Sequence, residues 1–140
     1  MRSLIALCII LFSFAAAPAM AAAVEARIDL SQQRMTVYKH GRLIHSWPVS
    51  TARRGYVTPT GSYRPTRMYT EYYSKKYHNS PMPYSIFFRG GYAIHGTGAV
   101  KSLGRPASHG CVRLHPSNAR TLYNMVRQVG AKNTSIRITH

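Results

Sequence analysis

The chain has 140 residues, and its 19 lysines and arginines against only 3 aspartates and glutamates give a formal net charge of +16. This length fits one compact domain, and an apolar content of 45% is enough to build a core. The three acids, Glu25, Asp29 and Glu71, leave too few carboxylates for the paired-carboxylate chemistry of glycosidases or for an oxygen-rich cation site. The excess of positive charge predicts an anionic environment or partner.

Residues 1–21 have the pattern of a secretory signal peptide. Arg2 supplies the basic start, residues 4–14 form an apolar core too short to span a membrane, and Ala19-Met20-Ala21 is a small-residue cleavage site. Cleavage between residues 21 and 23 leaves an exported domain over residues 24–140. Cys8 is removed with the leader, and the leucine before it argues against a lipid-modified start. The exported protein then carries one thiol, Cys111, and cannot form an internal disulfide.

The remaining basic residues are scattered along the chain. Only doublets such as Arg53-Arg54 and Lys75-Lys76 occur, and no dense basic stripe or recognisable module is present. A nucleic-acid partner is therefore not predicted. For an exported protein, cell-wall carboxylates and anionic lipid head groups are the more available anions.

Short strands are predicted along most of the chain, and one hairpin is expected at His40-Gly41. Alternating apolar residues or flanking turn residues place these strands at residues 26–30, 35–39, 43–49, 62–69, 84–88, 92–95 and 135–138. Residues 56–61 are expected to be loop and turn. Residues 70–83 hold tyrosines, lysines and prolines with little periodicity, which predicts a mobile loop that is either functional or disordered.

One helix is predicted directly after the last cysteine. Pro116 fits the first helical position, and Gly130 fits the end. The apolar residues between them recur at helical spacing, which predicts an amphipathic helix packed on a sheet: Ala119, Leu122, Tyr123 and Val126. The predicted fold class is mainly β, with one packed C-terminal helix.

The residues with chemical potential gather between His95 and His115. A thiol becomes a strong nucleophile when an imidazole takes its proton, so either His95, sixteen residues before Cys111, or His109, two residues before it, is a candidate base. Spacing alone leaves this choice open. No Asp or Asn side chain is at hand to orient the base, and a backbone carbonyl can do so by accepting the other ring proton.

Other residues of this segment have candidate roles of their own. Gly110 leaves its peptide free to point an N–H outward, which together with the N–H of Cys111 can form an oxyanion hole. Arg113 is placed to bind a carboxylate or to brace the site. Two alternatives stay open at this point: Cys111 is a buried inert thiol, or it binds zinc together with His95, His109 and His115, although their spacing matches no common zinc motif.

The motifs resemble those of the L,D-transpeptidase (YkuD-type) catalytic domain. The similarity rests on His95-Gly96-Thr97 followed by residues 108–114, Ser-His-Gly-Cys-Val-Arg-Leu, and extends to residues 49–51, 58–61 and 82–84. The resemblance implies a β-sandwich-like domain in which Cys111 is the nucleophile and His95 is the base.

The resemblance also implies roles for the surrounding residues. They are oxyanion or structural positions at Gly110, His109 and Ser108, a supporting carbonyl near Gly96, and substrate contacts from Arg113 and from a loop tyrosine, either Tyr77 or Tyr84.

The implied reaction is an acyl transfer on peptidoglycan. Cys111 attacks the bond after the diaminopimelate of a stem tetrapeptide and releases D-alanine, and an acceptor amine then resolves the thioester into a 3-3 cross-link or attaches a protein to the wall. No cofactor or metal is expected, and the partners are the donor and acceptor stem peptides. The protein is assumed to be a monomer. Its expected location is the periplasm or cell-wall compartment. Two other functions remain open: hydrolysis of the same acyl-enzyme, as in an L,D-carboxypeptidase or amidase, and wall binding without turnover.

Overall fold

The computed structural model describes residues 13, 15, 16 and 21–140, so the predicted leader lies almost entirely outside the described residues. The described strands and helices follow one another as β1 (Val24–Asp29), β2 (Arg34–Lys39), β3 (Arg42–Pro48), β4 (Gly61–Tyr63), β5 (Arg67–Tyr69), β6 (Tyr73–Ser74), the 3-10 turn η1 (Lys75–Tyr77), β7 (Ser80–Pro81), β8 (Ser85–Arg89), β9 (Tyr92–Gly96), η2 (Val100–Ser102), β10 (Val112–Leu114), α1 (Pro116–Val129), η3 (Ala131–Asn133) and β11 (Thr134–Thr139). Among these residues, no helix is long and apolar enough to cross a membrane.

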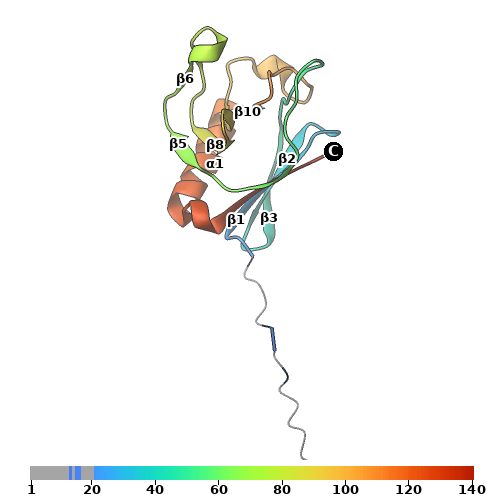
Figure 1. Ribbon diagram of the computed structural model, residues 1–140, viewed down its shortest axis with the longest axis vertical. Helices are drawn as coiled ribbons and strands as arrows, with labels where there is room; N and C mark the ends of the chain where they lie inside the picture. Colours follow the sequence, from blue (N-terminus) through green and yellow to red (C-terminus); the bar gives the residue numbers. More distant parts are fainter. Residues whose placement is uncertain (1–12, 14, 17–20) are drawn as a thin grey trace, which may run out of the picture.

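Two sheets form the body of the molecule (Figure 1). The larger has the order β3-β2-β1-β11-β4, with β1 parallel to β11 and antiparallel to β2. The β2–β3 hairpin turns at His40 and Gly41, whose φ angles of 48° and 77° are both positive, as a tight two-residue hairpin turn requires. The smaller sheet has the order β10-β9-β8-β5, with β9 and β10 parallel.

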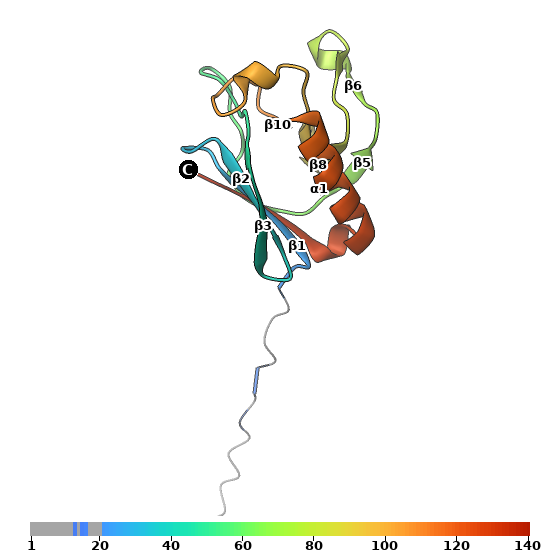
Figure 2. The same ribbon diagram turned by 180° about the vertical axis from the view of Figure 1, so that it is seen from behind.

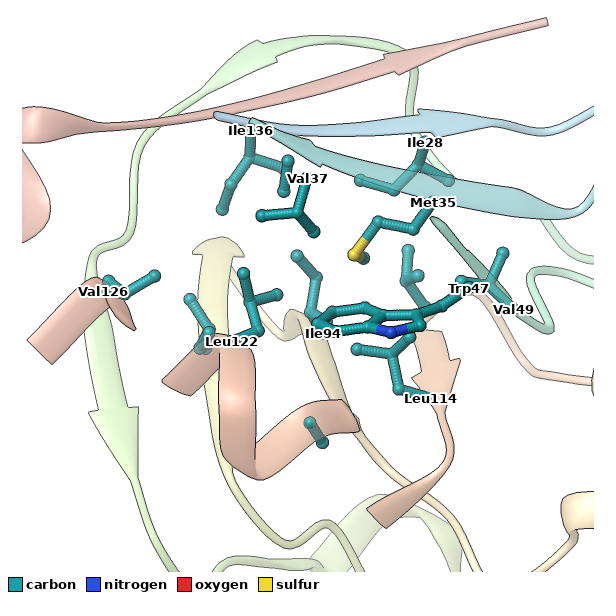
Figure 3. Close-up of a cluster of buried hydrophobic side chains, with 14 of the residues drawn as sticks. Ile28, Met35, Val37, Trp47, Val49, Ile94, Leu114, Leu122, Val126 and Ile136 are labelled. Atoms are coloured by element: carbon teal, nitrogen blue, oxygen red, sulfur yellow. The ribbon is translucent and has the colours of Figure 1, made fainter. Parts of the chain in front are cut away.

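The main hydrophobic core lies between the larger sheet on one side and the smaller sheet with α1 on the other, as Figures 2 and 3 show. Ile28, Met35 and Ile136 come from the larger sheet, while Ile94 and Leu122 face them from β9 and α1. All five side chains are almost completely buried. Burial of each such side chain contributes on the order of 2 kcal/mol, so this layer fixes the position of the smaller sheet.

The mainly β prediction with one C-terminal helix is confirmed. The predicted buried face of the helix is also correct, because Ala119, Leu122, Tyr123 and Val126 are the buried residues of α1. The helix begins at Pro116, and the N–H of Ser117 donates to Nδ1 of His115 at its N-terminus. The predicted strands match the observed ones, with ends shifted by one or two residues, except for residues 62–69.

Residues 62–69 do not form one strand. They divide into β4, which pairs with β11, and β5, which pairs with β8 in the other sheet. Buried Pro65 lies between them, and proline cannot donate a hydrogen bond to a ladder. The chain therefore crosses from one sheet to the other at this point.

Residues 70–83, predicted as a mobile loop, contain regular structure. Strands β6 and β7 pair as a two-stranded ribbon around η1, and the N–H of Met82 donates to the carbonyl of Tyr72 at 2.7 Å. We call residues 72–82 the 70s hairpin. In Figures 1 and 2 it lies at the same end of the molecule as the turn that contains η2.

Candidate active site

Strands β9 and β10 carry core residues on one face and reactive residues on the other. Val112 pairs with Ile94, and both are buried in the main core. The next pair in register is Arg113 with His95. Because successive side chains of a strand point to opposite faces, His95 and Arg113 lie on the face away from the core, and Cys111, two residues before Arg113, joins them there.

The His95 ring is held by a backbone carbonyl. Its Nδ1 lies 2.7 Å from the carbonyl oxygen of Gly96. Since a carbonyl only accepts, Nδ1 carries the proton and Nε2 is left with a free lone pair. Burial lowers the pKa of His95 to about 4, and the positive charge of Arg113 acts in the same direction, while the hydrogen bond to Gly96 opposes both. His95 is therefore a neutral imidazole at physiological pH.

The Cys111 thiol is half-buried beside the same strand. Its Sγ lies 3.8 Å from the carbonyl oxygen of Gly91, to which it donates. Burial raises the pKa of Cys111, while the backbone of Ala93 and the charge of Arg113 partly oppose that rise. The resting pair is thus a neutral thiol and a neutral imidazole, with the cation of Arg113 next to both.

The turn that precedes Cys111 is tied by the buried hydroxyl of Ser108. This hydroxyl donates to the carbonyl of Cys111 at 2.6 Å and accepts from the N–H of Gly110 at 3.0 Å. The Gly110 N–H is therefore engaged within the turn, so the sequence-based assignment of this group as a free oxyanion donor does not match the structure. Ser108 and Gly110 instead set the backbone around Cys111.

Residues 50–58 support the same turn from outside. The N–H of Ser50 donates to the carbonyl of Arg113, and the N–H of Arg113 donates back at 2.8 Å. The hydroxyl of Thr58 donates to the carbonyl of Gly110 at 2.8 Å. Gln33 in turn holds Thr51 by a pair of side-chain hydrogen bonds. Hydrogen bonds from residues 50–58 therefore hold the backbone on both sides of Cys111, and Gln33, in the turn between β1 and β2, ties this segment to the larger sheet.

A cavity of about 720 Å³ opens over this face of the smaller sheet. Met82, Phe87 and Ala93 form a small buried cluster beneath it, with Cys111 and Tyr72 packed against them. The 70s hairpin covers one side. The lining includes His95, Ser108, His109, Cys111 and Arg113 together with Tyr77.

His109 lies at the rim between two aromatic rings, each tilted against its own, and this group of three rings is called the stack below. Its ring centroid is 4.6 Å from that of Tyr56 and 4.3 Å from that of Tyr77. This stack links the 70s hairpin to the turn before Cys111. Partial burial lowers the pKa of His109, and the charges of Arg53, Arg113 and Lys76 lower it further. Its position at the rim, in contrast to that of His95 on the sheet, favours His95 as the base.

Two sequence-based candidates lie elsewhere. Tyr84 does not line the cavity; its ring packs edge-on against Tyr123 of α1 at 5.7 Å and contacts the main core. His115 is exposed at the start of α1, where Nδ1 accepts from the Ser117 N–H. Within residues 21–140, no group of three His, Cys, Asp or Glu side chains is arranged to hold a metal, so the zinc alternative has no geometric support.

Several contributors to the site were not identified from the sequence. The carbonyl of Gly91, the hydroxyl of Thr58 and the ring of Tyr56 act through contacts with residues distant in the chain. Thr58 and Gly110 are 52 residues apart. Of these three residues, only Thr58 belongs to a motif of the family resemblance, residues 58–61, and that motif does not indicate its partner.

Comparison with known proteins identifies the family to which this chain is similar. Residues 23–138 match the family model of the L,D-transpeptidase catalytic domain. The protein YkuD of Bacillus subtilis (strain 168) is 23% identical over 103 residues, which cover 71% of this chain and 58% of that protein.

Solved structures agree on the fold. An L,D-transpeptidase from Mycobacterium smegmatis has a TM-score of 0.76 at 22% identity, covering 85% of this chain and 59% of that one. An L,D-transpeptidase (Yku) from Stackebrandtia nassauensis has a TM-score of 0.74 at 27% identity, covering 92% and 61%. The chain thus spans less than two thirds of the length of these relatives.

Proposed function

Because the chain belongs to the L,D-transpeptidase catalytic domain family, we propose that it is a cysteine transpeptidase acting on peptidoglycan stem peptides, with Cys111 as nucleophile and His95 as general base. One observation carries the proposal. His95 on β9 and Cys111, directly before the adjacent parallel strand β10, line one cavity, and the Gly96 carbonyl leaves Nε2 of His95 free to accept a proton.

The first half-reaction forms a thioester. Cys111 Sγ attacks the carbonyl carbon between diaminopimelate and the terminal D-alanine, and the thiol proton passes to His95 Nε2. Since both groups are neutral at rest, proton transfer accompanies the attack rather than preceding it. His95 then gives this proton to the departing amine, so D-alanine leaves and the acyl group remains on sulfur.

The second half-reaction frees the enzyme. The acceptor amine of another stem attacks the thioester carbon and loses a proton to His95, and the thiolate leaves and is reprotonated. The product is a 3-3 cross-link, or a wall-attached protein where the amine belongs to one.

The N–H of Cys111 and the hydroxyl of Tyr77 are the proposed donors to the oxyanion, and Arg113 positions the substrate. Residues 1–21 are proposed to direct export to the periplasm or cell-wall compartment, where this substrate is found.

The test is a product analysis by mass spectrometry after incubation of the exported form with disaccharide tetrapeptide. A dimer that lacks one D-alanine is the expected product. A tripeptide instead would show that water resolves the acyl-enzyme, as in a carboxypeptidase. If neither product forms, both enzymatic functions are wrong and wall binding without turnover is left.

Single substitutions test the roles of the two residues. Cys111→Ser and His95→Ala are each expected to lower the rate by at least about a thousandfold, because one removes the nucleophile and the other the base. His140→Ala at the exposed C-terminus is the control and is expected to keep the full rate. Near-normal turnover in His95→Ala together with loss of turnover in His109→Ala would mean that His109 is the base.

A further inference from the structure

The cavity is strongly cationic. Lys75, Lys76 and Arg113 line it, whereas none of its lining residues, all of which the structure describes, is aspartate or glutamate. A concave site lined by one sign of charge concentrates ligands of the opposite sign. The ligand of this cavity is therefore expected to carry negative charge near these side chains.

The acids of the protein do not neutralise these cations. Glu25 forms an ion pair with Arg27 at 2.8 Å, and Asp29 accepts from Ser31 and from the N–H of Gln32, all within or just after β1 in the other sheet. Glu71 is exposed ahead of β6 and does not line the cavity. Among the described residues, no carboxylate thus forms an ion pair with Lys75, Lys76 or Arg113.

The cations are distributed over two walls. Arg113 lies on the sheet face beside Cys111, half-buried, with Nη1 donating to the carbonyl of Ala107 at 3.3 Å. Lys75 and Lys76 belong to η1 at the tip of the 70s hairpin. The ammonium of Lys76 lies 5.4 Å from the centroid of the Tyr77 ring, which stacks on His109. A ligand that reaches from Cys111 to the hairpin meets positive charge at both ends.

The positive charges around the cavity act together on His109. Arg113 on the sheet, Lys76 on the hairpin and Arg53, whose guanidinium lies over the Tyr56 ring, each contribute to the lowered pKa of His109. The positive charges of the sheet and of the hairpin therefore act together on the same group at the edge of the cavity.

We propose that Lys75 and Lys76 are specificity-determining residues that make the cavity select stem peptides with free carboxylates over the same peptides carrying carboxamides. This inference rests on the proposed function, since it takes the stem peptide as the ligand. While Arg113 holds a carboxylate near the reacting bond, the two lysines attract a second one, such as the free carboxylate on the diaminopimelate side chain. A carboxamide has nearly the same shape without the charge, so it loses this attraction.

The experiment compares two donor tetrapeptides that differ only at the side-chain carboxyl of diaminopimelate, one free and one amidated. For the wild-type protein at low ionic strength, kcat/KM is expected to be about five-fold higher for the free acid, because each exposed charge pair contributes only modestly. The preference is expected to fall below about two-fold in the double variant Lys75→Gln/Lys76→Gln and to weaken with added salt.

A matched control removes the same charge elsewhere. Lys39→Gln/Lys132→Gln lowers the net charge equally, at two exposed residues outside the cavity, and is expected to keep the wild-type preference. Equal use of the two donors by the wild-type protein would overturn the selectivity, and an unchanged preference in Lys75→Gln/Lys76→Gln would overturn its assignment to the two lysines. Either result leaves the transpeptidase function intact.

A binding measurement separates this inference from the chemistry. Calorimetric titration of Cys111→Ala with the same two peptides is expected to show tighter binding of the free acid by a similar factor, whether or not the wild-type protein turns them over. If turnover is absent but this difference in affinity is present, the proposed reaction fails and the selectivity stands. Equal affinities would refute the selectivity directly.

Discussion

At the scale of single residues, burial keeps both members of the proposed catalytic pair uncharged. Desolvation penalises the charged form of any titratable group, so it raises the pKa of Cys111 and lowers that of His95. An enzyme with this pair holds no permanent thiolate. Its thiol is activated only when a substrate carbonyl is present to take up the electron pair as the proton leaves.

Alkylation of Cys111 tests this resting state. Because the thiolate is the reactive species, iodoacetamide is expected to react with Cys111 at pH 7 at least about ten-fold more slowly than with an exposed cysteine peptide, and the rate is expected to keep rising with pH beyond the point at which that of the peptide levels off. Mass spectrometry of the labelled protein gives the rates. Arg113→Gln is expected to slow the reaction further, since Arg113 favours the thiolate. A fast, pH-independent reaction between pH 6 and 7 would instead indicate a thiolate–imidazolium pair.

His95 is expected to make stability depend on pH. Its pKa in the folded protein is about 4, against 6.5 for the unfolded chain, so below pH 6.5 the unfolded state gains a proton that the folded state does not. Stability is therefore lost as the pH falls from about 6.5 to 4, by roughly 3 kcal/mol from this residue. Urea unfolding at pH 7 and pH 4.5 measures the loss. His95→Gln keeps an N–H for Gly96 but does not titrate, and an identical pH slope in this variant would contradict the assignment.

At the scale of elements, the sequence predicts what depends on local periodicity. The buried face of α1 follows from the spacing of Ala119, Leu122 and Val126, which is a local property of a helix. Pro65 separates β4 from β5, but the fact that these strands enter different sheets depends on pairing with β11 and β8, which are distant in the chain. The 70s hairpin has no alternating pattern because its strands are two residues long.

The same distinction applies to the site. Cys111 was predicted as the one thiol of the exported domain, and His95 was preferred to His109 only through the family resemblance. The contacts that set their geometry, such as Thr58 to Gly110 and Tyr56 to His109, join separate loops and carry no signal in either loop alone.

Gly110 shows how tightly the turn before Cys111 is packed. Its φ angle is +133°, and a Cβ there would lie 2.8 Å from the carbonyl oxygen of Val57 and 2.7 Å from the Tyr92 ring. Gly110→Ala is therefore expected to lose about 3 kcal/mol of stability from strain and steric overlap together, and most of the activity.

Gly55→Ala provides the control for this substitution. Gly55 also has a positive φ, +90°, but an added Cβ meets no atom within 4 Å, so only about 1 kcal/mol from backbone strain is expected. Denaturant midpoints of the two variants separate the steric contribution from the conformational one. Equal losses would mean that the contacts around Gly110 relax without cost.

At the scale of the whole molecule, the proposed function depends on a sheet that is distant from the cavity. Strand β11 lies between β1 and β4, and it is the element that joins the β1–β2–β3 meander to β4. Its inward residues, Ile136 and Ile138, are fully buried in the core that also supports the inner faces of β9 and β10. Strand β11 of the larger sheet therefore shares its core with β9, which carries His95, and with β10, which directly follows Cys111.

Two adjacent substitutions in β11 test this connection, because they lie on opposite faces of one strand. Ile138→Ala removes buried methyl groups and is expected to cost about 3 kcal/mol, whereas exposed Arg137→Ala is expected to change stability by no more than about 0.5 kcal/mol. If the domain unfolds as one unit, Ile138→Ala will lower the hydrogen-exchange protection of β9 and of β1 by the same free energy, although no residue of the site is altered. Loss of protection confined to β11 and β1 would mean that the smaller sheet and its cavity are stable independently of the larger one.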